Sequence, residues 1–405
     1  MTNKALSHIR VIDLTEGIAG PYCTKLLSGY GAEVIKIEDP KTGDMMRGGG
    51  PFFKNGEGLE TSIPFLWLNT GKKSVTLDLK TEKGPEILKQ LVKDADVLME
   101  SFSPGVMSGL GLGYEVFREI NPRLIMTSIS NFGQTGPYKD YQAEEIELNA
   151  LSGGMYVTGD PEKAPLASGP ALYQYTAGQH AFVATLMAVY RRGLDGEGQH
   201  VDVSIQESGL EHIEITLSYC LQQGKNARRG GHLFVPWDAY ECRDGYAVVI
   251  AMPYRHWHRA AEVFSDHRLF AKKYDHILDR MKHRREYEEI LRPCVKALGK
   301  KYLFYQGQSR GLAFAYVAGL DEVLESPQHK DRIFFEEMDH PAVGRHKYCG
   351  APFRMSETPW QSARAPLLGE HNQDVFGEGL RVAFGGNSSF CGTRKDTDNH
   401  VKSGV

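Results

Sequence analysis

The chain has 405 residues, with 47 Lys plus Arg against 51 Asp plus Glu, which gives a formal net charge of −4. Nucleic-acid-binding domains usually carry a basic excess, so this balance argues against a nucleic-acid partner. Hydrophobic residues make up 41% and charged residues 24% of the chain. This composition is typical of soluble globular proteins and excludes long disordered or collagen-like regions.

The sequence also argues against secretion and membrane insertion. It has no run of about 18 apolar residues, so no membrane-spanning helix and no membrane partner are expected. The first residues lack the apolar stretch and cleavage site of a signal peptide. Six widely spaced cysteines form no C-x-x-C pair. This cysteine usage fits a reducing cytoplasm, so we expect a cytoplasmic protein without disulfides or a zinc ribbon.

The first 130 residues predict a repeated strand–helix pattern. Strands are predicted over 10–14, 32–37, 74–79, 97–99 and 124–129. Helices are predicted over 22–29, 81–93 and 114–120. This alternation is typical of an open, parallel α/β sheet with helices on both faces. The sequence therefore predicts an α/β fold with a Rossmann-like large domain.

The rest of the chain predicts further elements and a second domain. A long helix is expected over 175–191, a strand over 200–204, a helix over 207–217 and a hairpin over 239–250. A basic, glycine-rich connection from residue 222 marks a domain boundary. We predict a large domain over 1–221, a linker and small domain over 222–335, a return to the large domain over 336–380, and a mobile tail over 381–405.

The glycine-rich turn after the first strand invites a comparison with NAD-binding proteins. Glu38 stands 21 residues after Gly17, where an acid could hold a ribose. The turn, however, is Gly17-Ile-Ala-Gly20 and lacks the second close-approach glycine of the G-x-G-x-x-G motif. A tight βα turn is the favoured interpretation.

Three other candidates have ordinary explanations. Ser152 stands near a G-x-S-x-G pattern, but the segment before it is helical rather than a strand. His256 and His258 lack a third ligand nearby, so no metal site is predicted. The carboxylates Glu144, Glu145 and Glu147 could form a general-base cluster, but a solvated helix face is favoured.

Many stretches, in order from about Ile9 to Leu380, resemble the family III CoA-transferases. They are Val11–Leu14 with Ala19–Pro21, Gly31–Glu38, Gly43–Asp44 with Arg47, Asn69–Ser74, Leu77–Leu79, Phe102–Gly105, Asn121–Ile125, Gly133–Pro137, Gly198–Asp202 and Ala365–His371. The resemblance implies a large Rossmann-like domain, a small domain and a C-terminal return. It also implies a dimer of two interlocked rings.

The resemblance implies nucleophilic catalysis by an Asp carboxylate, which attacks the acyl thioester. That Asp follows a Ser-Gly-x-Ala-Leu-x stretch, which here is Ser168–Tyr173, and the next residue is Gln174. An amide is a poor nucleophile and forms no mixed anhydride, so we expect no catalytic residue in this chain. The His and Asp of the racemase branch correspond to Glu144 and Gln174, which argues against racemase chemistry too.

For CoA binding, the resemblance points to Gly17, Ile18, Ala19, Ser101 and Phe102. Several members carry Arg, Asn and Arg at the positions of Asp39, Ser101 and Gly109, so the binding of CoA phosphates is expected to be weak here. No cofactor is expected, because CoA enters as a substrate.

These expectations combine into a subunit of a family III CoA-transferase. CoA would move from an acyl-CoA donor, such as succinyl-CoA, to a carboxylic acid such as benzylsuccinate in anaerobic aromatic degradation. A homologous partner subunit would supply the Asp in a hetero-oligomer. One alternative is an active homodimer in which Glu145, Glu147 or Asp160 replaces the nucleophile. Others are a non-catalytic acyl-CoA-binding protein and, as a minor candidate, an NAD-linked enzyme.

Overall fold

The computed structural model describes residues 4–56, 58–226, 229, 235–251 and 254–383. These residues divide into two compact units: the described residues within 1–227 and 333–405 form one, and those within 228–332 form the other. The sequence analysis placed the two boundaries at 222 and 335. Residues 381–383 of the predicted tail belong to the last helix, and 384–405 lie outside the described residues.

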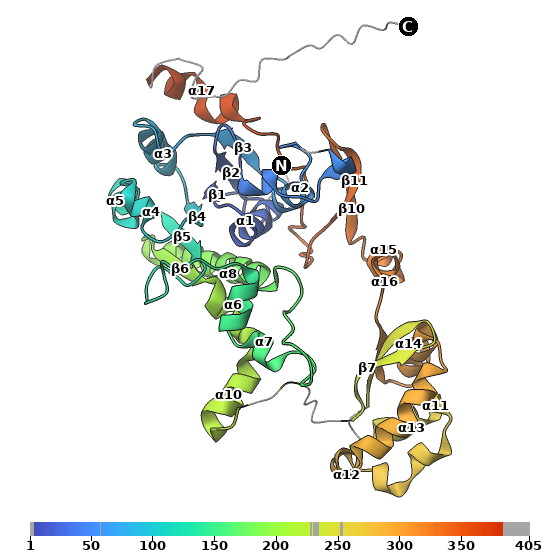
Figure 1. The fold of residues 1–405 in the computed structure, drawn as a ribbon. Coiled ribbons are helices and arrows are strands. Elements are labelled where there is room, and N and C mark those ends of the chain that lie inside the picture. Colours follow the sequence, from blue (N-terminus) through green and yellow to red (C-terminus); the bar gives the residue numbers. More distant parts are fainter. Residues whose placement is uncertain (1–3, 57, 227–228, 230–234, 252–253, 384–405) are drawn as a thin grey trace, which may run out of the picture. The chain divides into compact units, whose positions relative to one another are not determined.

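The first unit contains a six-stranded parallel sheet in the order β3-β2-β1-β4-β5-β6 (Figure 1). The strands are β1 (Arg10–Leu14), β2 (Glu33–Glu38), β3 (Lys73–Thr76), β4 (Val97–Glu100), β5 (Ile125–Ser130) and β6 (His200–Ser204). This order is that of a doubly wound fold, and it confirms the predicted α/β class with a Rossmann-like large domain.

Helices cover both faces of this sheet. On one face, Leu27 of α1 (Ala19–Gly29) and Ala177 of α8 (Leu172–Asp195) share a core with Val11. On the other face, Leu88 of α3 (Gly84–Val92) packs in a core with Ile12. Val11 and Ile12 are neighbours in β1, and successive side chains of a strand point to opposite faces. Both faces of the central strands are therefore buried, as is usual for a parallel sheet.

The remaining elements of this unit connect the strands or follow the second unit. The helices are α2 (Ile63–Leu68), α4 (Val106–Gly109), α5 (Tyr114–Ile120), α6 (Glu145–Leu151), α7 (Gly154–Val157), α9 (Ile205–Leu210), α10 (Glu214–Gln223) and α17 (Asn372–Ala383). The 3₁₀ turns are η1 (Met45–Gly48), η2 (Phe53–Asn55) and η3 (Glu211–Ile213). A hairpin of β10 (Phe335–His340) and β11 (Gly344–Cys349) shares a small core with α2.

Two predicted helices differ from the observed ones. Helix α1 begins three residues earlier than expected, at Ala19, because Pro21 is tolerated in a first turn, where its missing N–H has no helical partner. The prediction of a single helix over 207–217 is wrong. The chain forms α9, η3 and α10 there, and the backbone of Ile213 leaves the helical region with φ −119° and ψ 16°.

The second unit has its own sheet and core. Strands β7 (Trp237–Cys242), β8 (Gly245–Ile250) and β9 (Ala313–Tyr316) pair antiparallel, and β7 with β8 confirm the predicted hairpin. Its helical elements are α11 (Tyr254–Phe264), η4 (His267–Phe270), η5 (Lys272–Tyr274), α12 (Ile277–Lys282), α13 (Arg284–Lys296), α14 (Lys300–Ser309), α15 (Leu320–Leu324) and α16 (Pro327–Asp331). Trp257, Tyr287 and Phe314 are fully buried in its core. Within the described ranges of the whole chain, no helix has the length and apolar character needed to cross a bilayer.

Candidate functional site

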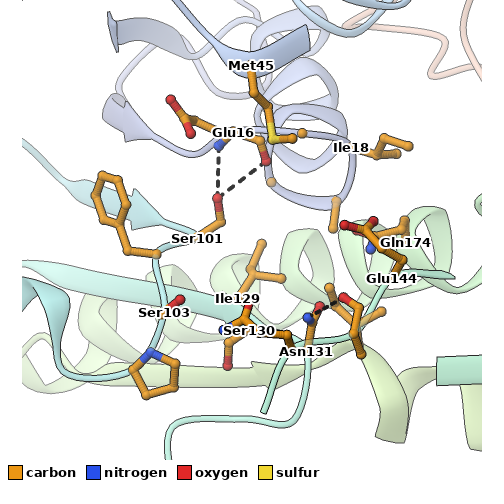
Figure 2. Close-up of a pocket in the computed structure, with 18 of the residues that line it drawn as sticks. Glu16, Ile18, Met45, Ser101, Ser103, Ile129, Ser130, Asn131, Glu144 and Gln174 are labelled. Atoms are coloured by element: carbon orange, nitrogen blue, oxygen red, sulfur yellow. Dashed lines mark hydrogen bonds between the residues drawn. The ribbon is translucent and has the colours of Figure 1, made fainter. Parts of the chain in front are cut away.

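A cavity of about 360 Å³ lies at the carboxyl ends of β1, β4 and β5 (Figure 2). Its walls come from the turn after β1, the segment after β4, the end of β5, the loop over 139–144 and the start of α8. In the strand order, β1 and β4 are neighbours where the winding direction reverses. Ligands of open α/β sheets bind at this switch point, outside the carboxyl ends of the strands. The cavity therefore lies where this fold places its ligand sites.

Buried charges fix the turn after β1. The Asp13 carboxylate accepts hydrogen bonds from Thr15 N at 2.9 Å and from its hydroxyl at 2.5 Å. Lys36 Nζ donates to the Thr15 carbonyl at 2.6 Å and pairs with Asp44 at 2.7 Å. Burial alone would raise the pKa of Asp13, but Lys72 and Lys36 hold it well below its usual value. The turn is thus tied to the sheet on two sides.

Ser101 joins this turn to the segment after β4. Its hydroxyl accepts a hydrogen bond from Glu16 N at 2.8 Å (Figure 2). The next residue, Phe102, donates its backbone N–H to the Glu100 carboxylate at 2.8 Å. Burial raises the pKa of Glu100 to about 7. Sequence reasoning missed Glu100, since an acid at the end of a buried strand carries no motif.

The five residues predicted to bind CoA all line this cavity. They are Gly17, Ile18, Ala19, Ser101 and Phe102. The structure brings them together because parallel strands end at one edge of the sheet. Other lining residues carried no signal in the sequence, namely Ser130, Asn131, Lys139, Asp140 and Tyr141.

Gln174 lies in the first turn of α8 and also lines the cavity. Gly178, one turn further on, allows α8 to cross close to α1, since a Cβ there would stand 2.6 Å from the Ala19 carbonyl oxygen. Figure 2 shows Gln174 beside Glu144 on the same wall. The position at which the family resemblance implies the nucleophile therefore faces the cavity.

The predicted alternative carboxylates have other contacts. Glu145 accepts the backbone N–H of Tyr173 at 2.8 Å and of Gln174 at 3.3 Å. Glu147 accepts the Glu144 N–H at 3.0 Å. Asp160 accepts the Glu162 N–H at 3.0 Å and lies 3.7 Å from Lys163.

None of these three lines the cavity, whereas Glu144 does. The interpretation of all three glutamates as a solvated helix face is wrong for Glu145, which holds the start of another helix.

Glu38, the candidate ribose-binding acid, is committed to an internal ion pair. Its carboxylate receives Arg47 Nε at 2.6 Å and Nη2 at 3.0 Å, and both side chains are fully buried. The structure thus gives no support to the NAD-linked alternative. Asp39, in contrast, is exposed and accepts the N–H groups of Lys41 and Thr42.

The remaining sequence candidates have structural contacts outside the cavity. Ser152 donates its hydroxyl to the Leu148 carbonyl at 2.6 Å. His258 lies 3.3 Å from Asp275. Among the residues that the structure describes, no group of three His, Cys, Asp or Glu side chains could hold a metal ion.

Comparison with known proteins agrees with this geometry. The sequence matches CoA-transferase family III over residues 6–372. It is 32% identical over 402 residues to the succinyl-CoA:(R)-benzylsuccinate CoA-transferase subunit BbsE of Thauera aromatica, covering 93% of this chain and 95% of that protein. It is 33% identical over 389 residues to the human succinyl-CoA:glutarate CoA-transferase, covering 93% of this chain and 86% of that protein. The crystal structure of a CAIB/BAIF family protein from Brucella suis covers 92% of this chain and 98% of its own, with 27% identity and a TM-score of 0.82.

A doubly wound sheet with a cavity at its switch point, together with these relatives, defines the class as an α/β CoA-transferase. The chain belongs to CoA-transferase family III, which confirms the resemblance seen in its sequence. Its relatives support CoA-transferase activity.

Proposed function

We propose that this chain is the subunit without the nucleophile in a two-chain CoA-transferase, and that a homologous partner subunit supplies the catalytic Asp. The observation that carries the proposal is Gln174, which occupies the start of α8 and lines the cavity. Family chemistry needs an oxygen that attacks the thioester carbonyl and later leaves as a carboxylate. A neutral amide does neither, so position 174 of this chain does not supply the reacting group.

The charged residues that line the cavity also support a non-catalytic role for this chain. Glu16, Asp140 and Glu144 line the cavity, and Lys139 is the cation among the described lining residues. Burial is the main cause that raises the pKa of Glu16, and the nearby Asp44 adds to it. An acceptor carboxylate and the CoA phosphates are therefore weakly attracted, even though Gly17–Ala19, Ser101 and Phe102 offer a binding surface.

An exposed apolar stripe on α8 supports a second chain. Val183, Met187, Tyr190 and Leu194 follow one another at helical spacing, and their side chains are 53–74% exposed. Helical residues separated by three or four positions share a face. Contiguous exposed apolar surface of this kind marks protein–protein contacts. A homologous subunit, interlocked with this one as the family resemblance implies, is the proposed occupant.

The relatives supply the proposed substrates. Succinyl-CoA appears in the names of the benzylsuccinate and glutarate enzymes, so we take it as the donor. Benzylsuccinate is the proposed acceptor, since the relative that carries it is itself described as a subunit. CoA acts as a substrate in this scheme, and no resident cofactor is invoked.

Native mass spectrometry of the protein from its own cells tests the proposal. We expect a complex with a second chain of similar mass, in equal amounts, that bears an Asp where this chain has Gln174. The isolated chain should transfer no CoA from succinyl-CoA. A homodimer that turns over alone would overturn the proposal. Hydroxylamine trapping would then locate the nucleophile, and Glu144 is the first carboxylate to examine because it shares the cavity wall with Gln174.

A further inference from the structure

Two tyrosines in the loop after β5 form an exposed stack. The rings of Tyr138 and Tyr141 lie 5.0 Å apart at an interplanar angle of 20°, and Phe132 packs edge-on behind Tyr138 at 6.0 Å. Tyr141 N donates to the Tyr138 carbonyl at 2.8 Å, so a tight turn holds the pair. The two side chains are 47% and 59% exposed. Single exposed tyrosines are ordinary, but a fixed stack of two is a preformed flat surface.

This stack adjoins the cavity. Tyr141 itself is one of the lining residues, as is its neighbour Lys139. Within the described part of the chain, Lys139 makes no ion pair and no side-chain hydrogen bond. A flat aromatic face beside an unpaired ammonium is the combination that binds a planar ring bearing an anionic group.

A second, independent observation points to a ligand in the same cavity. Ser130 ends β5 and lines the cavity, and its side chain is only 7% exposed. Its hydroxyl has no hydrogen-bond partner among the described residues. Buried hydroxyls are nearly always hydrogen-bonded, so this one is available to a polar group of a bound molecule.

We propose that Tyr141, backed by Tyr138, is a stacking platform for a flat aromatic ring whose anionic group meets Lys139. A polar group of the same ligand would reach Ser130. The ring has two chemical sources: the adenine of CoA with its phosphates, or the phenyl ring of an aryl-substituted acid. Asp140 and Glu144 line the same cavity and oppose an anion, so most of the affinity comes from the ring.

Binding to the isolated chain tests this site without relying on turnover or on the partner subunit. Titration calorimetry would use adenosine 3′,5′-bisphosphate for the adenine source and benzylsuccinate for the aryl source. Pantetheine and succinate serve as ringless controls. Tyr141→Ala should weaken binding of a ring-bearing probe roughly tenfold to a hundredfold. Tyr141→Phe should retain it, and Lys139→Met should weaken it less than Tyr141→Ala.

Tyr305→Ala is the matched control, because Tyr305 is similarly exposed, at 61%, and lies in the second unit. Thermal melts of each variant confirm folding. A Tyr141-dependent loss for either ring probe supports the platform and identifies the ring's source. The proposal is overturned if the affinity of neither ring-bearing probe changes in Tyr141→Ala. It is also overturned if that variant keeps both affinities and only impairs assembly with a partner chain. The subunit role is tested separately by turnover and native mass, so either proposal can fail alone.

Discussion

Glu145 holds the start of α8 at Gln174, across 29 residues of sequence. One carboxylate oxygen accepts the Gln174 N–H at 3.3 Å and the other accepts the Tyr173 N–H at 2.8 Å. The residue before the helix, Ala171, has φ 59° and no side chain that could cap it. The Glu145 carboxylate of α6 therefore caps the N-terminus of α8. This contact helps to hold the side chain of Gln174 against the cavity.

Loss of this cap should destabilise the protein. Glu145→Ala leaves the N–H groups of Tyr173 and Gln174 without their acceptor and should lower the free energy of unfolding by about 1–2 kcal/mol. Urea denaturation measures the change. Glu119→Ala, on the exposed face of α5, is the control and should change it little. An equal effect of both variants would mean that the Glu145 contacts contribute nothing specific.

The sequence predicted the sheet well because its central strands are short apolar runs between clear turns. The structure brings Gly17–Ala19 and Ser101 together for a topological reason, since parallel strands end at one edge of the sheet, but the strand pattern did not name these residues. The family resemblance then named the cavity residues that composition and spacing could not.

The contacts of Glu145 and of the tyrosine stack were not predictable in the same way. In the sequence, Glu145 is one of three neighbouring acids on a predicted helix. Its capping role depends on the packing of α6 against α8, which are far apart in the sequence. The Tyr138–Tyr141 stack depends on one loop conformation. No periodic pattern encodes either of these tertiary contacts.

If this chain has the role proposed above, a carboxylate introduced at position 174 should give it the covalent chemistry of the family. In Gln174→Asp, the new oxygen would attack the thioester carbonyl and release CoA thiolate. That thiolate could then attack the side-chain acyl carbon and expel the donor acid as a carboxylate. The helix N-terminus favours a negative group at this position. Intact-mass spectrometry after incubation with succinyl-CoA should show a covalent adduct on this variant.

Gln174→Asn is the matched control for that experiment, since it shortens the side chain equally and keeps the amide. It should remain unlabelled, as should the unmodified chain. Labelling of the unmodified chain would contradict the proposal that this chain has no nucleophile. We also expect Glu144→Gln, added to Gln174→Asp, to increase labelling, because it removes a negative charge from the same cavity wall.

Removing only one partner of the Glu38–Arg47 pair should strongly lower the free energy of unfolding. Arg47→Met would leave a buried carboxylate without its bidentate partner, and we expect a loss of about 3–5 kcal/mol in unfolding free energy. Arg47→Met combined with Glu38→Gln should recover much of that loss, because the buried charge is then gone. Urea midpoints of the two variants measure the difference. Equal midpoints for the single and double variants would show that the unpaired charge is not the cause.

Glu100 should make stability depend on pH near neutrality. Its pKa rises from 4.5 to about 7 in the folded protein because burial disfavours the charged form. The folded state therefore binds a proton that the unfolded state has already released. This contribution is fully present below about pH 4.5 and is lost as the pH rises through about 7. The loss reaches at most roughly 3.5 kcal/mol, since one pKa unit corresponds to about 1.4 kcal/mol.

Glu100→Gln removes this proton exchange while keeping an acceptor for the Phe102 N–H. Relative to the unmodified chain, the variant should gain stability at pH 8 and gain little at pH 5. Urea midpoints at both pH values give the comparison. Glu115→Gln, an exposed acid on α5, should shift both midpoints equally. If Glu100→Gln behaves like this control, Glu100 is ionised in the folded protein at pH 5. The Phe102 N–H would then donate to a charged Glu100 carboxylate across this pH range.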